Sequence, residues 1–158
     1  MIQKGHCSCK QINYSFDNKK IINSFHCHCE DCQRSTGAGK ASILVIKKSN
    51  FNLNCEPKFY GTKGSMGSTV NRGFCSNCGS GIFSYLKELP NFLFLKVGSL
   101  EDSSWVKIES NYFTKSCNEW NMPDEQLKSF KGNPNLLENL KTLIKSLNSF
   151  KKTLFACK

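Results

Sequence analysis

Apolar and polar residues alternate in a series of short segments along the first two thirds of the chain. Alternation with a period of two is typical of β-strands, since successive side chains of a strand point to opposite faces of its sheet. We predict strands at 11–16, 21–28, 41–46, 68–74, 81–85, 92–97 and 106–113. The pattern therefore predicts a mainly β domain over residues 1–132.

After Gly132 the spacing of the apolar residues changes to three or four. Asn133 and Pro134 form a favourable helix start, because Asn caps a helix and Pro fits its first turn. We predict one basic amphipathic helix over residues 133–158, an appendage rather than a second domain. Its lysines suit a membrane surface or an acidic partner. The simpler interpretation is that its apolar stripe packs on the β domain or on a second subunit. Packing on a second subunit would make the protein a homo-oligomer.

The length of 158 residues suits one domain. The longest apolar stretch, 41–46, is far shorter than the roughly 18 residues that cross a bilayer, and the first ten residues lack an export signal. We therefore expect a cytoplasmic protein without a membrane span. Because disulfides do not persist in a reducing compartment, the ten cysteines favour metal binding or catalysis.

The formal net charge of +10 favours anionic partners in general. Proteins that bind nucleic acid usually carry a clustered basic stripe with aromatic residues beside it. Here the lysines are dispersed, and the phenylalanines mostly alternate within predicted strands. The charge therefore does not single out nucleic acid as a partner.

Seven of the cysteines fall into three groups along the chain. In a strand, a Cys-x-Cys pair directs both sulfurs to one side, and Cys-x-x-Cys-Gly is typical of a zinc-binding turn. A structural zinc site has four protein ligands, whereas a catalytic one has three and an open position. The seven cysteines divide most simply into a closed site of Cys7, Cys9, Cys75 and Cys78 and an incomplete site of Cys27, Cys29 and Cys32.

Other interpretations of these groups stay open. A redox role for Cys75 and Cys78 would require a βαβ context, and none is evident. His26, His28 or Cys55 would make the second site structural by adding a fourth ligand, although strand alternation places both histidines opposite Cys27 and Cys29. The isolated cysteines are expected to be unpaired thiols: Cys55, Cys117 and Cys157.

Five motifs in this order resemble the glutathione-dependent formaldehyde-activating enzymes and their relatives, which include centromere protein V. They are GHCSC (5–9), HCHCEDCQRSTGAG (26–39), RGFCSNCGSGIF (72–83), VGSLED (97–102) and an aromatic stretch ending at Trp120. The resemblance covers roughly residues 3 to 130. The five motifs together are specific to the family, whereas any one of them alone would not be.

The resemblance implies a zinc-stapled β fold of small antiparallel sheets, of the β-tent type, with two zinc ions per chain. It implies that Cys7, Cys9, Cys75 and Cys78 hold a structural zinc and that Cys27, Cys29 and Cys32 hold a catalytic zinc. The activity that it implies is a carbon–sulfur lyase reaction, in which formaldehyde and glutathione, as co-substrate, form S-hydroxymethylglutathione.

The residues suit this chemistry, because a zinc ion with an open position lowers the pKa of a thiol or polarises a carbonyl. Arg34 is a candidate contact for a glutathione carboxylate, and the alternative is a solvated surface arginine. Gln33 stands where the family often has a basic residue, so the physiological thiol and aldehyde stay open.

We predict a zinc-dependent enzyme that acts on a thiol adduct. The alternative is a non-catalytic zinc-binding module that binds nucleic acid or another polyanion through its basic surface. A purely structural role for both metal sites is the third option.

Overall fold

The computed structural model describes residues 1–64, 67–135, 137–142 and 144. Its strands are β1 (Ile2–His6), β2 (Asn13–Asp17), β3 (Ile21–Cys27), β4 (Ala41–Lys47), β5 (Phe51–Leu53), β6 (Lys58–Lys63), β7 (Thr69–Phe74), β8 (Gly81–Leu86), β9 (Leu89–Lys96), β10 (Ser110–Tyr112) and β11 (Lys128–Ser129). The helix α1 spans Glu30–Thr36. Short 3-10 turns lie at Asn18–Lys20, Lys48–Asn50, Val97–Ser99, Thr114–Ser116 and Glu119–Asn121. The prediction of a mainly β fold is thus confirmed.

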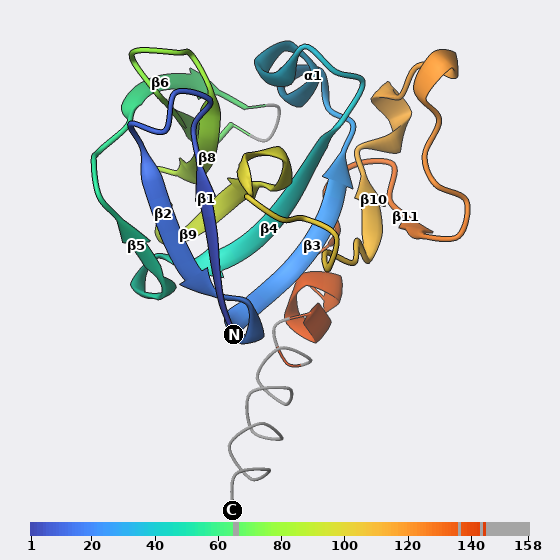
Figure 1. Ribbon diagram of the computed structural model, residues 1–158. Coiled ribbons are helices and arrows are strands. Elements are labelled where there is room, and N and C mark those ends of the chain that lie inside the picture. The colour runs from blue at the N-terminus through green and yellow to red at the C-terminus, as the bar shows by residue number, and fades with distance from the viewer. Residues whose placement is uncertain (65–66, 136, 143, 145–158) are drawn as a thin grey trace, which may run out of the picture.

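The strands form two sheets (Figure 1). The first has the order β1-β2-β5 and is antiparallel throughout. The second has eight strands in the order β11-β10-β3-β4-β9-β8-β7-β6, and β10 runs parallel to both of its neighbours. The second sheet is therefore larger than the small sheets that the resemblance implied. Its pairs β3–β10 and β10–β11 are parallel rather than antiparallel.

The smaller sheet packs on one face of the larger one. Tyr14 and Phe16 of β2 are buried together with Leu44 and Ile46 of β4 and with other residues of β8 and β9. The Tyr14 hydroxyl and the Ser99 hydroxyl are hydrogen-bonded at 2.6 Å across this contact. The two sheets therefore share one hydrophobic core.

A second core lies on the opposite face of β3 and β4, because neighbouring residues of a strand face opposite sides. Ile43 and Val45, which alternate with the residues of the first core, are buried there beside Phe25 and Tyr112. The rings of Phe25 and Tyr112 are stacked with 4.1 Å between their centroids. Cys27 belongs to this core, so the face that carries it also carries the candidate site.

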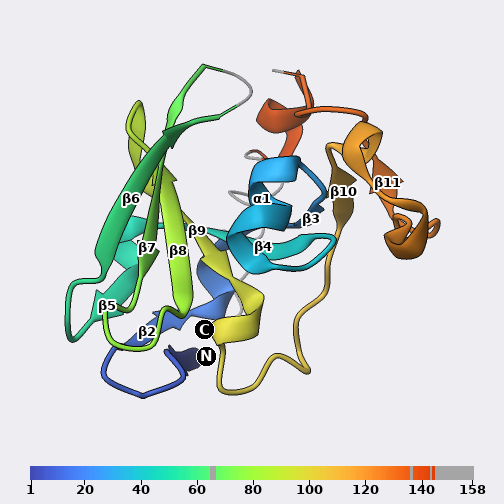
Figure 2. The same cartoon turned by 90° about the horizontal axis from the view of Figure 1, so that it is seen from above.

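The helix α1 lies between the β6–β8 strands and β10 (Figure 2). Two residues separate it from β3, and Gly37, which has a positive φ of 66°, follows its last residue and closes the helix. Left-handed backbone of this kind favours glycine and is typical of helix C-termini. The predicted strand at 21–28 therefore ends one residue early, and the next turn of chain is helical.

Residues 137–142 and 144 are helical, as predicted for the C-terminal segment. The side-chain oxygen of Asn135, rather than Asn133, caps this segment by accepting a hydrogen bond from the Glu138 amide at 2.9 Å. Leu137, Leu140 and Ile144 are all about half exposed or more, so these described positions of the apolar stripe are not covered by the β domain. Positions 136, 143 and 145–158 of the predicted helix lie outside the described residues. Within the described part of the chain, no helix has the length and apolarity that a membrane span requires.

Candidate metal centres

The four-cysteine group joins two turns that are far apart in the sequence. Cys7 and Cys9 follow β1, and Cys75 and Cys78 lie in the connection between β7 and β8. The four sulfurs all lie within 4.8 Å of one another. The Sγ atoms of Cys7 and Cys9 are 3.5 Å apart, and those of Cys9 and Cys75 are 3.7 Å apart. Four sulfurs at about 2.3 Å from one zinc ion would lie roughly 3.8 Å apart, so this group fits a tetrahedral thiolate site.

Backbone hydrogen bonds shape both turns of the four-cysteine group. The Ile12 amide donates to Cys7 Sγ at 3.2 Å. The Gly79 amide donates to the Cys75 carbonyl at 2.9 Å, and Gly79 has the left-handed φ of 75° that this tight turn requires. The hydroxyls of Ser8 and Ser80 are hydrogen-bonded at 2.9 Å and link the two turns directly.

The three-cysteine group lies where β3 passes into α1. Cys27 is the last residue of β3, Cys29 is the N-cap of α1, and Cys32 lies in its first turn. Their sulfurs all lie within 4.8 Å of one another, and Cys27 Sγ and Cys29 Sγ are 3.4 Å apart. The Cys32 amide donates to Cys29 Sγ at 3.4 Å. Strand alternation is not what brings the sulfurs of the Cys-x-Cys pairs together: only Cys27 lies in a strand, and turns and a helix N-terminus position the other cysteines.

The described residues supply no fourth ligand atom to the three-cysteine group from any other Cys, His, Asp or Glu. The Nδ1 atom of His26 is hydrogen-bonded to the Ser42 hydroxyl at 2.9 Å. His28 is fully buried, and it too lies outside the group. Cys55 is exposed and also separate. None of the three alternative fourth ligands is therefore in place here.

The hydrogen bonds among the three sulfurs favour a negative charge on Cys29 over Cys27 and Cys32. Hydrogen bonds from the Cys27 and Cys32 side chains lower the pKa of Cys29 to about 3. The pKa of Cys27 is raised, because its hydrogen bonds to Cys29 and Cys32 keep its proton and burial disfavours its thiolate. A single thiolate held by protonated thiols is the expected metal-free state of a site whose ligands lose protons when a metal binds.

A family model for the glutathione-dependent formaldehyde-activating enzyme matches residues 2–116, which include all seven grouped cysteines. The chain belongs to the glutathione-dependent formaldehyde-activating enzyme family. A crystal structure of a Rhodobacter sphaeroides protein is similar, with 20% sequence identity, a TM-score of 0.49, and coverage of 66% of this chain and 90% of that chain. No curated protein matches the sequence.

In this member of the formaldehyde-activating family, Arg72 flanks the three-cysteine group. Its guanidinium lies 3.8 Å from the Asp31 carboxylate and donates to the Thr62 hydroxyl, and only 17% of the side chain is exposed. The positive charge of Arg72 acts on Cys29 and Cys32 and favours negative charge on their sulfurs. The sequence places Arg72 three residues before Cys75, and nothing in that spacing indicates that it approaches the other cysteine group.

Arg34, the predicted glutathione contact, lies on α1 with 74% of its side chain exposed. It pairs with Glu30 at 3.0 Å, one helical turn away. Exposed pairs of this kind contribute little stability, so Arg34 stays available to an anionic ligand. The structure does not bring it into contact with the cysteine sulfurs.

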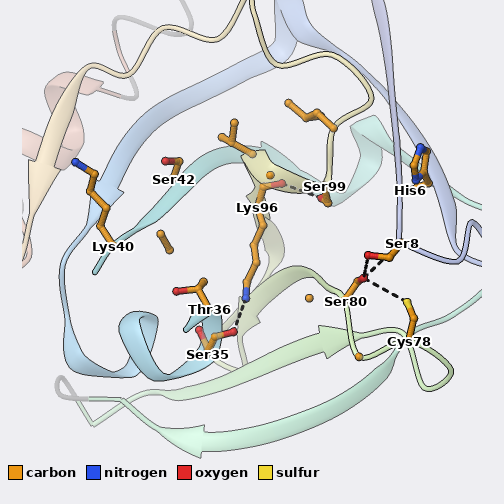
Figure 3. Close-up of a pocket in the computed structure, with 16 residues that line it drawn as sticks. His6, Ser8, Ser35, Thr36, Lys40, Ser42, Cys78, Ser80, Lys96 and Ser99 are labelled. Atoms are coloured by element: carbon orange, nitrogen blue, oxygen red, sulfur yellow. Dashed lines mark hydrogen bonds between the residues drawn. The ribbon is translucent and has the colours of Figure 1, made fainter. Parts of the chain in front are cut away.

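A cavity of about 730 Å³ lies beside the four-cysteine group and the C-terminal end of α1 (Figure 3). Cys78 of the four-cysteine group contributes to its wall, and so do Ser35 and Thr36 at the end of α1. Most other polar groups in the wall are hydroxyls, together with the cations Lys40 and Lys96. Among the described residues that line it there is no Asp or Glu, so the cavity suits an anionic ligand.

Proposed function

We propose that this protein is a zinc-dependent enzyme that joins a thiol to an aldehyde, with glutathione and formaldehyde as the substrates that the family name suggests. The reaction belongs to the carbon–sulfur lyases, since its reverse cleaves a carbon–sulfur bond without hydrolysis. One observation carries the proposal: three convergent cysteines, with no fourth described protein ligand, in a chain of this family.

Cys27, Cys29 and Cys32 would hold the catalytic zinc ion. When bound, this ion would supply Lewis-acid chemistry, which lowers the pKa of a thiol or polarises a carbonyl. The spacing of the sulfurs fits this ion, and clustered thiolates are typical zinc ligands. Cys27 is buried in an apolar core, with Cys29 and Cys32 partly buried beside it, and this limited contact with water strengthens electrostatic interactions there.

The reaction itself is a balanced addition. The sulfur of the thiol forms a bond to the aldehyde carbon, and the carbonyl π electrons move to the oxygen. The thiol loses one proton and the oxygen gains one, so the addition is balanced. The chain has to stabilise negative charge on sulfur and then on oxygen. Arg72 is placed for this, because its charge already acts on the cysteine sulfurs.

We assign the four-cysteine group to a structural zinc ion. It would link the turn after β1 to the turn before β8, and thereby fix the smaller sheet against the larger one. Arg34 remains a candidate contact for a glutathione carboxylate, at the cost of its pair with Glu30. We place the protein in the cytoplasm, where reduced glutathione and reduced cysteines coexist.

Zinc content and turnover test the proposal together. The purified protein should hold two zinc ions per chain and consume formaldehyde only when glutathione is present. The C32S variant should retain the zinc of the four-cysteine group and lose turnover. The matched control is C55S, since Cys55 is an exposed cysteine outside both groups, and it should retain both properties. Two bound zinc ions without thiol-dependent turnover would contradict the proposal, as would full activity of C32S.

A further inference from the structure

Lys96, the last residue of β9, has an unusual position for a lysine. Its side chain is half-buried, and its ammonium donates to the carbonyl oxygen of Ser35 at 3.1 Å. No Asp or Glu among the described residues forms an ion pair with it. An ammonium has three N–H donors, so two remain for a further partner. Figure 3 shows the side chain extending along the cavity toward the end of α1.

The position of Lys96 is determined by the segment that follows the four-cysteine group. Gly81, three residues after Cys78, lies directly against the lysine side chain. A Cβ atom at Gly81 would lie 2.7 Å from Lys96 Nζ and 3.2 Å from Cε, closer than such atoms approach. The absence of a side chain at position 81 therefore gives the ammonium its place in the cavity wall.

The same ammonium is near the three-cysteine group. The ammonium donates to Ser35 of α1, the helix that also carries Cys32. Burial lowers the pKa of Lys96, and negative charge on Cys32 opposes this shift. The two arginines of this region do not line the cavity: Arg72 pairs with Asp31, and the exposed Arg34 pairs with Glu30. Lys40 also lines the cavity, but its ammonium points away from Lys96 and Ser35 in Figure 3.

We propose that Lys96 binds a carboxylate of the thiol substrate inside this cavity and thereby selects anionic thiols over neutral ones. This inference rests on the proposed function, because it requires a thiol that reacts at the three-cysteine group. The hydroxyls of Ser35 and Thr36 lie in the same part of the wall, but both donate to the Cys32 carbonyl, so the ammonium of Lys96 is the donor that this part of the wall offers to a carboxylate. Lys96 is then a specificity-determining residue that distinguishes glutathione from thiols without a carboxylate.

The test compares two thiols in the K96M variant, which keeps most of the aliphatic length of the side chain and removes its charge. We expect the KM for glutathione to rise by about 10- to 100-fold, the loss typical of a hydrogen bond to a charged group. Turnover with 2-mercaptoethanol, which has no carboxylate, should be unchanged. The matched control is K87M, because Lys87 is exposed in the turn between β8 and β9 and does not line the cavity. An unchanged KM for glutathione in K96M, or equal losses with both thiols, would overturn the inference.

Binding of S-methylglutathione separates this inference from the proposed function. Calorimetry on the zinc-loaded protein should show the same loss of affinity in K96M, even if no thiol supports turnover. Inactive wild-type protein would overturn the proposed function alone, whereas equal affinities of wild type and K96M would overturn the role of Lys96. If K96M does not fold, wild-type protein should still bind S-methylglutathione more tightly than its dimethyl ester by a similar factor. Equal affinity for the two ligands would then overturn the inference.

Discussion

At the scale of single residues, Cys29 has two separate roles. As the N-cap of α1, its sulfur accepts a hydrogen bond from the Cys32 amide, and as a member of the three-cysteine group it offers a ligand atom. Cysteine is an uncommon N-cap, whereas serine is among the best. The helix start and the metal ligand therefore depend on the same sulfur atom, and substitution can separate them.

We expect C29S and C29A to lose the metal of the three-cysteine group equally and to differ in stability. Serine retains the cap of α1, whereas alanine leaves the Cys32 amide without its acceptor, which costs about 1 kcal/mol. Zinc analysis and urea unfolding of the two variants test this expectation. Equal free energies of unfolding would show that the capping contact contributes nothing.

Metal binding to the three-cysteine group should depend on pH. A hydrogen bond with Cys27 lowers the pKa of Cys32, but the hydrogen bond with Cys29 and burial outweigh it and raise this pKa to about 12. Cys27 also has a raised pKa, so both thiols are protonated at pH 7 while Cys29 is a thiolate. Zinc binding must then release about two protons, and lower pH weakens it because protons compete with the metal.

Calorimetric titration in two buffers of different ionisation enthalpy measures this release. The protein used should retain the zinc of the four-cysteine group, so that only the three-cysteine group is titrated. Zinc affinity that is the same at pH 6 and pH 8 would contradict the assigned protonation states.

At the scale of elements, the sequence was sufficient to predict the strands in which apolar and polar residues alternate clearly. It was not sufficient to predict α1. Glu30 and Asp31 in its first turn and Gly37 at its end are typical helix signals. We did not predict this helix, because cysteines two residues apart also suit a strand, in which they lie on the same face. The strand predicted at 106–113 shrinks to Ser110–Tyr112, because only these residues pair with β3.

Gly5 of β1 lies in close contact with Tyr14 and Ser99, and its substitution tests this packing. A Cβ atom at this position of β1 would lie 2.2 Å from the Tyr14 ring and 2.5 Å from the Ser99 carbonyl oxygen. We expect G5A to lower the free energy of unfolding by about 1–3 kcal/mol, the usual cost of overpacking. The matched control is G98A, because a Cβ at Gly98 meets no atom within 4 Å. Urea unfolding that gives equal stabilities for the two variants would contradict this description of the contact.

At the scale of the whole molecule, one cavity is lined by Cys78 of the four-cysteine group and by the end of α1, the helix that carries Cys32. The division of the grouped cysteines into four and three was predictable, because each motif contributes two or three cysteines that are close in sequence. The positions of Arg72 and Lys96 were not, since they depend on the order β4-β9-β8-β7 within the larger sheet. That order brings a cation from β7 and another from β9 to the group formed by β3 and α1. The cysteines thus indicate the chemistry, and the sheet order determines the charges around it.

The central claim is that Cys27, Cys29 and Cys32 hold a zinc ion whose fourth position is completed by a thiol substrate. A crystal structure of the zinc-loaded protein with glutathione tests it most directly. The account predicts zinc in both groups and the glutathione sulfur about 2.3 Å from the ion of the three-cysteine group. A fourth protein side chain bound permanently to that ion, with glutathione elsewhere, would contradict it.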